Sequence, residues 1–227
     1  MTVPAFVVAA RTMAYLNQRQ EVIANNLANA NTDGFKADRI TGRSFDDLFP
    51  EARASLDLQQ GTVRDTGRVL DLALETDGFL VVSTPQGERL TRGGQFAMDA
   101  AGLLVDRDGN PVLGLEGALH VRGDLIEIGP DGTVVVDGAR AGRLRVDQVA
   151  HPATLVKEGA GRFIATEGSL AASEVRIRQG ALEDANVDPM AGTVDMIQIQ
   201  RAYSTNAEVL RVLDSVLGTL TTDIGRV

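Results

Sequence analysis

Residues 188–227 read DPMAGTVDMIQIQRAYSTNAEVLRVLDSVLGTLTTDIGRV, and this stretch predicts one long helix. Its seam residues recur at alternating steps of three and four, which is the spacing of a heptad repeat. The seam consists of Met196, Ile199, Tyr203, Asn206, Leu210, Leu213, Leu217 and Leu220. Asp188 is suited to cap the helix, and Pro189 to occupy its first turn, where a missing N–H costs nothing. A helix of this length spans roughly 50 Å, which favours a subunit that assembles through its ends.

The opposite end of the chain predicts a second helix over residues 4–30. Its seam consists of Phe6, Ala9, Met13, Leu16, Ile23, Leu27 and Ala30, with Gln20 as a polar member. Asn25, Asn26 and Asn29 are poor helix formers, so we expect this helix to be only marginally stable alone. Residues 31–34 end it, with Gly34 suited to a left-handed turn. Two interpretations stay open for both seams: they pack within one chain, or they pack between molecules.

Asn206 is the one amide in the seam of the C-terminal helix. Our hypothesis is that it fixes register or partner choice, as a single buried Asn does in a coiled coil. The alternative is an Asn that faces solvent on a slightly rotated helix.

Between the helices, residues 61–180 predict an antiparallel β domain. Short β-prone runs are separated by turn signals such as Asp-Gly, which supply the positive φ of tight hairpins. The runs are residues 71–74, 79–83, 103–106, 124–128, 133–136, 144–149 and 175–178. We therefore expect an α+β fold, with a discontinuous, coiled-coil-like helical module (1–35 and 181–227) and a central, mainly antiparallel β domain (61–180). Residues 36–60 are expected to be a linker, in which Ser44–Phe49 has the pattern of a helical turn or loop.

The composition disfavours several classes of function. The net charge of −9 disfavours nucleic acid as a partner, because no basic patch offsets the phosphate charge. The absence of cysteine excludes a disulfide framework, a thiol nucleophile and a thiolate metal site. The apolar run Pro4–Ala10 is too short to span a membrane, and no basic region precedes it as in a conventional signal peptide. Only Lys36 and Lys157 are lysines among 22 cationic residues, which we interpret as a composition bias.

No pattern of catalytic or metal-binding residues is present in the sequence. His120 and His151 have no ligand-type neighbours at helical or hairpin spacing. Residues 106–110 look superficially like a calcium loop, but Gly is fourth rather than sixth and Gly117 replaces the glutamate at the twelfth position. A turn is the better interpretation. We predict no catalytic residue, no metal, no cofactor and no enzymatic activity.

The two ends of the chain resemble a known family. Residues 21–36, EVIANNLANANTDGFK, are similar to the N-terminal signature of bacterial flagellar rod and hook proteins. Residues 180–188, GALEDANVD, and the later Met196-Ile197 and Gln200–Tyr203 resemble their C-terminal signature. Residues 71–80 and 90–96 look like the start of that family's β domain. The signature residues are Asn25, Asn26, Leu27, Asn29, Thr32, Gly34, Phe35, Gln200, Arg201, Ala202 and Tyr203.

The resemblance implies a structural, axial subunit of the rod in the flagellar basal body. Such a subunit is exported through the flagellar type III apparatus without a cleaved signal peptide and polymerises in the periplasmic space through its terminal helices. The implied partners are other rod subunits, copies of itself and the export apparatus, with no nucleic acid and no membrane insertion.

Within this family we favour a proximal rod subunit, and two alternatives to it remain. The compact link between Lys36 and Gly61 resembles proximal rod proteins, whereas Gln200–Asn206 is closer to the distal rod type, so a distal rod or hook subunit is the first alternative. An alternative of another class is a secreted β-domain enzyme or carbohydrate-binding module. That class would need a cluster of carboxylates or histidines in a concave site.

Overall fold

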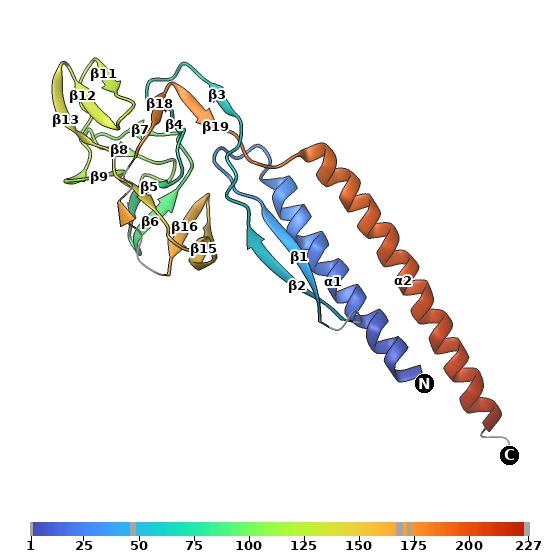
Figure 1. Ribbon diagram of the computed structural model, residues 1–227. Helices are drawn as coiled ribbons and strands as arrows, with labels where there is room; N and C mark the ends of the chain where they lie inside the picture. Colours follow the sequence, from blue (N-terminus) through green and yellow to red (C-terminus); the bar gives the residue numbers. More distant parts are fainter. Residues whose placement is uncertain (1, 46–48, 167–169, 172–173, 225–227) are drawn as a thin grey trace. The chain divides into compact units, whose positions relative to one another are not determined.

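The computed structural model describes residues 2–45, 49–166, 170–171 and 174–224. The chain forms two compact units (Figure 1). The helical unit contains residues 1–28, 38–55 and 187–227, and the β unit contains residues 29–37 and 56–186. The chain therefore passes between the two units four times. Residues 29–35 and 181–186, which the sequence suggested as parts of the helical module, belong to the β unit.

The helical unit consists of two helices and a two-stranded sheet. Helices α1 (Thr2–Ala28) and α2 (Pro189–Ile224) lie side by side and run antiparallel (Figure 1). The N–H groups of Met190 and Ala191 donate to Asp188 Oδ1 at 2.9 and 3.1 Å, so Asp188 caps α2 and Pro189 is its first residue. These contacts confirm the predicted helix start. The α+β class is confirmed as well.

The segment expected to be a linker contains strands β1 (Asp38–Phe45) and β2 (Phe49–Leu56), which pair in a two-stranded sheet. The prediction of a helical turn or loop was wrong for Ser44, Phe45 and Phe49, and residues 46–48 lie outside the described part of the chain. Pairing between two strands satisfies more backbone N–H and C=O groups than one isolated helical turn can. Strand β1 also contacts α1.

The β unit is antiparallel throughout the pairings described. Its largest sheet has six strands in the order β15-β16-β6-β5-β14-β17, and a second sheet has the order β11-β12-β13. Two-stranded sheets pair β18 with β4, β19 with β3, β7 with β8, and β10 with β9. The strands of the β unit are β3 (Val63–Asp65), β4 (Leu72–Leu74), β5 (Phe79–Thr84), β6 (Gly87–Thr91), β7 (Ala97–Met98), β8 (Leu104–Val105), β9 (Leu113–Gly114), β10 (Gly117–Ala118), β11 (Ile126–Ile128), β12 (Thr133–Val136), β13 (Ala139–Arg143), β14 (Val146–Gln148), β15 (Leu155–Gly159), β16 (Arg162–Ala165), β17 (Leu170–Ala171), β18 (Ile177–Gln179) and β19 (Ala181–Glu183). Each of the seven β-prone runs overlaps one of these strands, so those predictions are confirmed.

Strand β5 separates two hydrophobic clusters. Leu80 and Val82 join the larger cluster with residues such as Phe96, while Phe79 and Val81 join a smaller one with Leu90 and Phe163. Alternate residues of a strand point to opposite faces of its sheet, so β5 is buried on both faces. The Phe79 and Phe163 rings pack with their centroids 5.4 Å apart.

The last two strands of the β unit pair with its first two. Strand β19 pairs with β3 and β18 pairs with β4, so residues 177–183 return to the start of the unit. Close by, the N–H of Gly34 donates to the carbonyl of Glu183 at 2.6 Å. The end of the N-terminal signature and the start of the C-terminal signature therefore meet in one unit.

Candidate functional site

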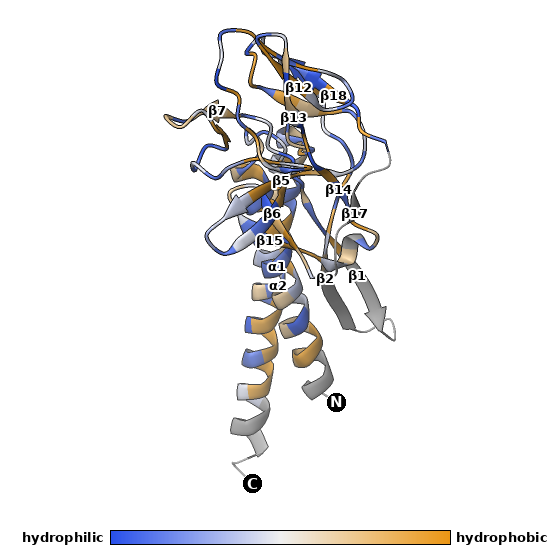
Figure 2. Ribbon diagram, turned by 90° about the vertical axis from the view of Figure 1, so that its left-hand side faces the viewer, coloured by the Kyte–Doolittle hydropathy of each residue, from blue (hydrophilic) through white to orange (hydrophobic). Residues whose placement is uncertain are grey.

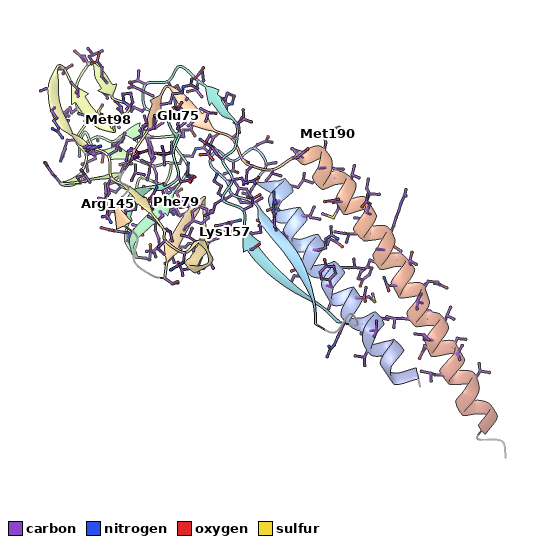
Figure 3. All side chains as sticks on the ribbon, viewed as in Figure 1. Glu75, Phe79, Met98, Arg145, Lys157 and Met190 are labelled. Atoms are coloured by element: carbon purple, nitrogen blue, oxygen red, sulfur yellow. The ribbon has the colours of Figure 1, made fainter. Side chains whose placement is uncertain are left out.

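The predicted seam residues form the more buried face of the helix pair. Leu16 and Ile199 are buried within this unit. The half-buried members are Met13, Ile23, Leu27, Met196, Tyr203, Asn206, Leu210, Leu213 and Leu217, and the side chain of Leu220 lies outside the described residues. Side chains from both helices occupy the space between the two ribbons, whereas Met190 at the start of α2 stands out into solvent (Figure 3). Within one chain, the seams of α1 and α2 thus face each other.

The C-terminal signature places two exposed and then two half-buried residues along one turn of α2. Gln200 and Arg201 are exposed, while Ala202 and Tyr203 are half-buried. Asn206 Nδ2 donates to the carbonyl of Ala202 at 2.9 Å. Asn206 therefore satisfies one of its amide hydrogens within its own helix.

The N-terminal signature ends in a tight turn after α1. The Asn29 carbonyl accepts from the N–H of Thr32 at 2.9 Å, and the Thr32 carbonyl accepts from the N–H of Phe35 at 3.1 Å. Gly34 has φ +69°, as predicted for a left-handed residue. A Cβ at Gly34 would lie 2.3 Å from the carbonyl carbon and oxygen of Arg92, so no side chain fits there.

Directly after this turn, Lys36 enters a buried ionic cluster, which we define as Lys36, Glu183 and Arg92. Lys36 Nζ donates to Glu183 Oε1 at 2.6 Å and to the carbonyl of Gln59 at 2.7 Å. Arg92 Nη1 donates to the second carboxylate oxygen, Glu183 Oε2, at 3.1 Å. Lys36 and Glu183 are each only 1% exposed. One carboxylate therefore pairs with two buried cations, so the cluster keeps one excess positive charge.

Further contacts hold each member of the ionic cluster in place. The N–H of Gly61 donates to Glu183 Oε1 at 3.1 Å, and Arg92 Nη2 donates to the carbonyl of Thr76 at 2.9 Å. The Arg92 guanidinium also lies 5.6 Å from the centroid of the Phe79 ring. Burial lowers the pKa of Lys36 from its usual 10.5, against the opposing effect of the Glu183 carboxylate. The cluster links the N-terminal signature to the β unit by charge as well as by packing.

Two asparagines hold the backbone at residues 37 and 38, where the chain passes between the two units. In the helical unit, Asn26 Nδ2 donates to the Asp38 carbonyl at 2.8 Å, and the Asp38 N–H donates to Asn26 Oδ1 at 3.0 Å. In the β unit, Asn186 Oδ1 accepts from the N–H of Ala37 at 2.7 Å. Each asparagine thus substitutes for a strand partner at the point where the chain changes units.

Asn186 makes three further hydrogen bonds, which the sequence pattern does not predict. Its Nδ2 donates to the carbonyls of Asp57 at 2.8 Å and Gln59 at 3.0 Å, and its backbone N–H donates to the carbonyl of Phe35 at 3.3 Å. The Phe35 ring is buried, with Lys157 Nζ 4.4 Å from its centroid.

Lys36, Glu183 and Asn186 lie within the two signatures, but the sequence pattern does not predict their roles. One signal was present: a lysine inside a signature, in a chain that otherwise uses arginine almost throughout, indicates a position that needs a compact ammonium group.

Residues 106–110, which look superficially like a calcium loop in the sequence, form a turn in the structure. Asp106 Oδ1 accepts from the N–H groups of Asp108 and Asn110 at 2.9 and 2.8 Å, which forms the predicted turn. This turn borders a polar cleft of about 70 Å³. The charges that line the cleft pair with one another, since Arg162 contacts Asp106 and Asp108. Within the described ranges no group of three or more His, Cys, Asp or Glu residues is arranged to hold a metal ion. The helices in those ranges include none long and apolar enough to cross a membrane.

Comparison with known families matches both ends and the middle of the chain. Residues 6–36 match the model "Flagella basal body rod protein", and residues 178–223 match "Flagellar basal body rod FlgEFG protein C-terminal". Residues 73–136 match "Flagellar hook protein FlgE/F/G D1 domain".

Full-length relatives agree with these matches. The chain is 32% identical to the flagellar basal-body rod protein FlgF of Caulobacter vibrioides, over 86% of this chain and 87% of the relative. The chain belongs to the flagellar basal-body rod protein family. It is also 33% identical to FlgF of Salmonella typhimurium, over 88% of this chain and 89% of the relative, and 29% identical to FlgG of Bacillus subtilis, over 90% and 93%. The relatives are structural rod proteins, and this chain is a structural rod protein of the FlgF/FlgG type.

Proposed function

We propose that this chain is a subunit of the proximal rod, that it has no catalytic activity, and that it polymerises through its terminal helices. The observation that carries the proposal is the pairing of α1 with α2: two chain ends that match rod-family models pack side by side in one unit. Each helix covers the seam of the other, so neither seam is covered in this way when one end of the chain is absent. The assembly element is therefore discontinuous in sequence and exists only after both ends of the chain are present.

The proximal position is supported by two observations. The segment between Lys36 and Gly61 is compact, which resembles proximal rod proteins. In addition, the FlgF relatives are 29–33% identical to this chain and the FlgG relatives 29–30%, so the highest of these identities are to FlgF. The distal type remains a second candidate because the run Gln200–Asn206 is closer to that type.

The proposal assigns a separate role to each part of the chain. The helix pair acts as a coiled-coil-like assembly module, and within the β unit the ionic cluster holds the segment after α1 against strand β19. Partners are other rod subunits and further copies of this chain. Family membership supports export through the flagellar type III apparatus, without cleavage, and a location in the periplasmic part of the rod.

Complementation of a deletion strain tests this function. In the bacterium that carries this protein, deletion of its gene should abolish motility, and electron microscopy of basal bodies should show an inner ring without a complete rod. Re-expression of the wild-type chain should restore both. Full motility of the deletion strain would refute the rod assignment.

Purified protein separates the proximal type from the distal type. A proximal subunit builds a short section and needs a different subunit to continue it. Concentrated, purified protein should therefore not grow into long tubes. Abundant long tubes of this chain alone, seen by electron microscopy, would support the distal type instead.

A further inference from the structure

A second apolar face runs along α2 beside its seam. Val209, Val212 and Val216 each immediately precede a seam leucine, and one residue corresponds to a rotation of about 100° around a helix. Their side chains are 46%, 55% and 46% exposed, whereas the adjacent leucines are half-buried. We call these three residues the valine face. Within the chain, the seam is the part of α2 that faces α1, and the valine face remains exposed.

Helix α1 has a matching exposed face in its first half. Phe6 and Val7 are 46% and 36% exposed, and Ala10 and Ala14 follow at helical spacing, also exposed. We call these four residues the N-terminal face. Further along the same side of α1 the exposed residues become polar, with Asn17, Gln18 and Glu21. The apolar part of this side therefore stops after about three turns.

Both faces lie at the same end of the helix pair. Because α1 and α2 are antiparallel, the first half of α1 lies beside the second half of α2 (Figure 1). The described turns near the two chain ends are largely apolar in colour (Figure 2). Large exposed apolar patches mark interaction sites.

We propose that the valine face of one copy packs against the N-terminal face of a second copy. This inference rests on the proposed function and names the surface through which it works. The small side chains of Ala10 and Ala14 let a second helix approach closely, while Phe6 and Val7 supply apolar area at the end of the contact. Since the two faces lie on different helices, the contact is heterologous. A heterologous contact joins copies head to tail in a row, and for a proximal subunit this row is short because a different subunit continues it.

The area of the two faces fits a contact that is weak in isolation. A lasting interface buries about 800 Å² on each partner, and these half-exposed side chains supply well under half of that. Two copies alone should therefore separate in dilute solution. In a rod each subunit makes the contact twice, once through each face, and neighbouring contacts add to it. The seam thus holds the two helices of one chain together, and the valine face joins one chain to the next.

Disulfide cross-linking tests the pairing directly, because the chain has no cysteine of its own. A strain lacking the gene should co-express two single-cysteine copies of different length, one carrying Ala10→Cys and the other Val212→Cys. After mild oxidation of isolated basal bodies, we expect a cross-linked band that contains both copies. Each variant expressed alone should give no such product. Cross-linking of Val212→Cys with itself would indicate a symmetric contact and overturn the proposal, as would a lack of cross-linking in rods that contain both copies.

Introduction of negative charge on the valine face separates this inference from the proposed function. Val212→Glu with Val216→Glu should leave the helix content and the melting temperature of the purified chain unchanged, but should reduce incorporation into rods at least tenfold. Val156→Glu is the matched control, since Val156 is 51% exposed on β15 of the other unit. If the wild-type chain fails to restore the rod, the proposed function fails. If wild type and the double variant restore it equally, only the role of the valine face fails.

Discussion

Lys36 Nζ and Glu183 Oε1 lie 2.6 Å apart, and this buried pair joins positions 147 residues apart in the chain. Arg92 contacts the other oxygen of the same carboxylate at 3.1 Å. Glu183 contributes more to this cluster than either cation does. It pairs with both cations, whereas each cation has only this carboxylate among its described ion pairs. Removing the anion therefore leaves two buried positive charges, while removing one cation leaves a balanced pair.

Glu183→Gln should destabilise the β unit more than Lys36→Met does. Breaking a buried ion pair from one side typically costs about 3–5 kcal/mol, and we expect the glutamine variant to fall in that range. Lys36→Met keeps the Arg92–Glu183 pair and loses mainly hydrogen bonds, which suggests a loss of about 1–3 kcal/mol. Chemical denaturation of the purified chains measures both values. Equal losses, or the reverse order, would show that Glu183 is not the centre of the cluster.

The cost of Glu183→Gln should also depend on pH. Burial lowers the folded-state pKa of Lys36 below its unfolded value of 10.5, so the unfolded chain binds more protons between those two values. Stability then rises with pH across that window, since deprotonation removes a buried charge. Loss of the Glu183 carboxylate lowers the pKa of Lys36 further, because that carboxylate favours the charged ammonium. The difference in unfolding free energy between wild type and Glu183→Gln should therefore shrink from pH 7 to pH 10. The double variant that also carries Lys36→Met should lack this trend.

Gly34→Ala should be far more damaging than Gly67→Ala. Both glycines have left-handed φ angles, +69° and +73°, so both substitutions incur a cost of about 1–2 kcal/mol for the backbone conformation. At Gly67 a Cβ would meet nothing within 4 Å, whereas at Gly34 it would lie 2.3 Å from the carbonyl group of Arg92. We expect Gly34→Ala to lower the melting temperature by at least twice as much. Similar shifts for both variants would mean that the turn moves to accept a side chain.

The sequence signals that proved reliable were local ones. Both helices and the cap at Asp188 follow from periodicity and from residues within one turn of each helix end. Strands such as β12 follow from an uninterrupted β-branched run. In contrast, β6 (GERLT) and β13 (ARAGR) contain too few apolar residues to show alternation, and their partners across the sheet define them.

The sequence does not predict the ionic cluster, because the cluster also depends on contacts between distant parts of the chain. Nothing local to Lys36 or Arg92 indicates that Glu183 lies between them. That placement depends on β19 pairing with β3, far away in the sequence. For the seam residues, periodicity alone did not decide which helix would cover them.

Asn186→Asp should destabilise the β unit by about 2–3 kcal/mol. The side-chain amide of Asn186 donates two hydrogen bonds, to the carbonyls of Asp57 and Gln59. A carboxylate would lose both donors and place a negative charge against two carbonyl oxygens. Asn17→Asp is the control, because Asn17 is an exposed residue of α1 and the same change there should have an effect within about 0.5 kcal/mol. Thermal unfolding followed by circular dichroism compares the two. A neutral Asn186→Asp would require another donor, such as water, to replace the amide.

Asn206→Leu should strengthen the helix pair but reduce correct incorporation into rods. Asn206 is half-buried on the seam, and its Nδ2 donates to the Ala202 carbonyl of its own helix. This hydrogen bond does not involve α1, so its loss removes none between the two helices. Leucine would add apolar area facing α1, worth up to about 1–2 kcal/mol. A uniform apolar seam, however, permits helices to slide or to accept other partners, which a single polar residue opposes. Helix content on heating measures the first effect, and competition with wild-type protein during rod assembly measures the second. Equal incorporation of Asn206→Leu and wild type would show that Asn206 does not select register or partner.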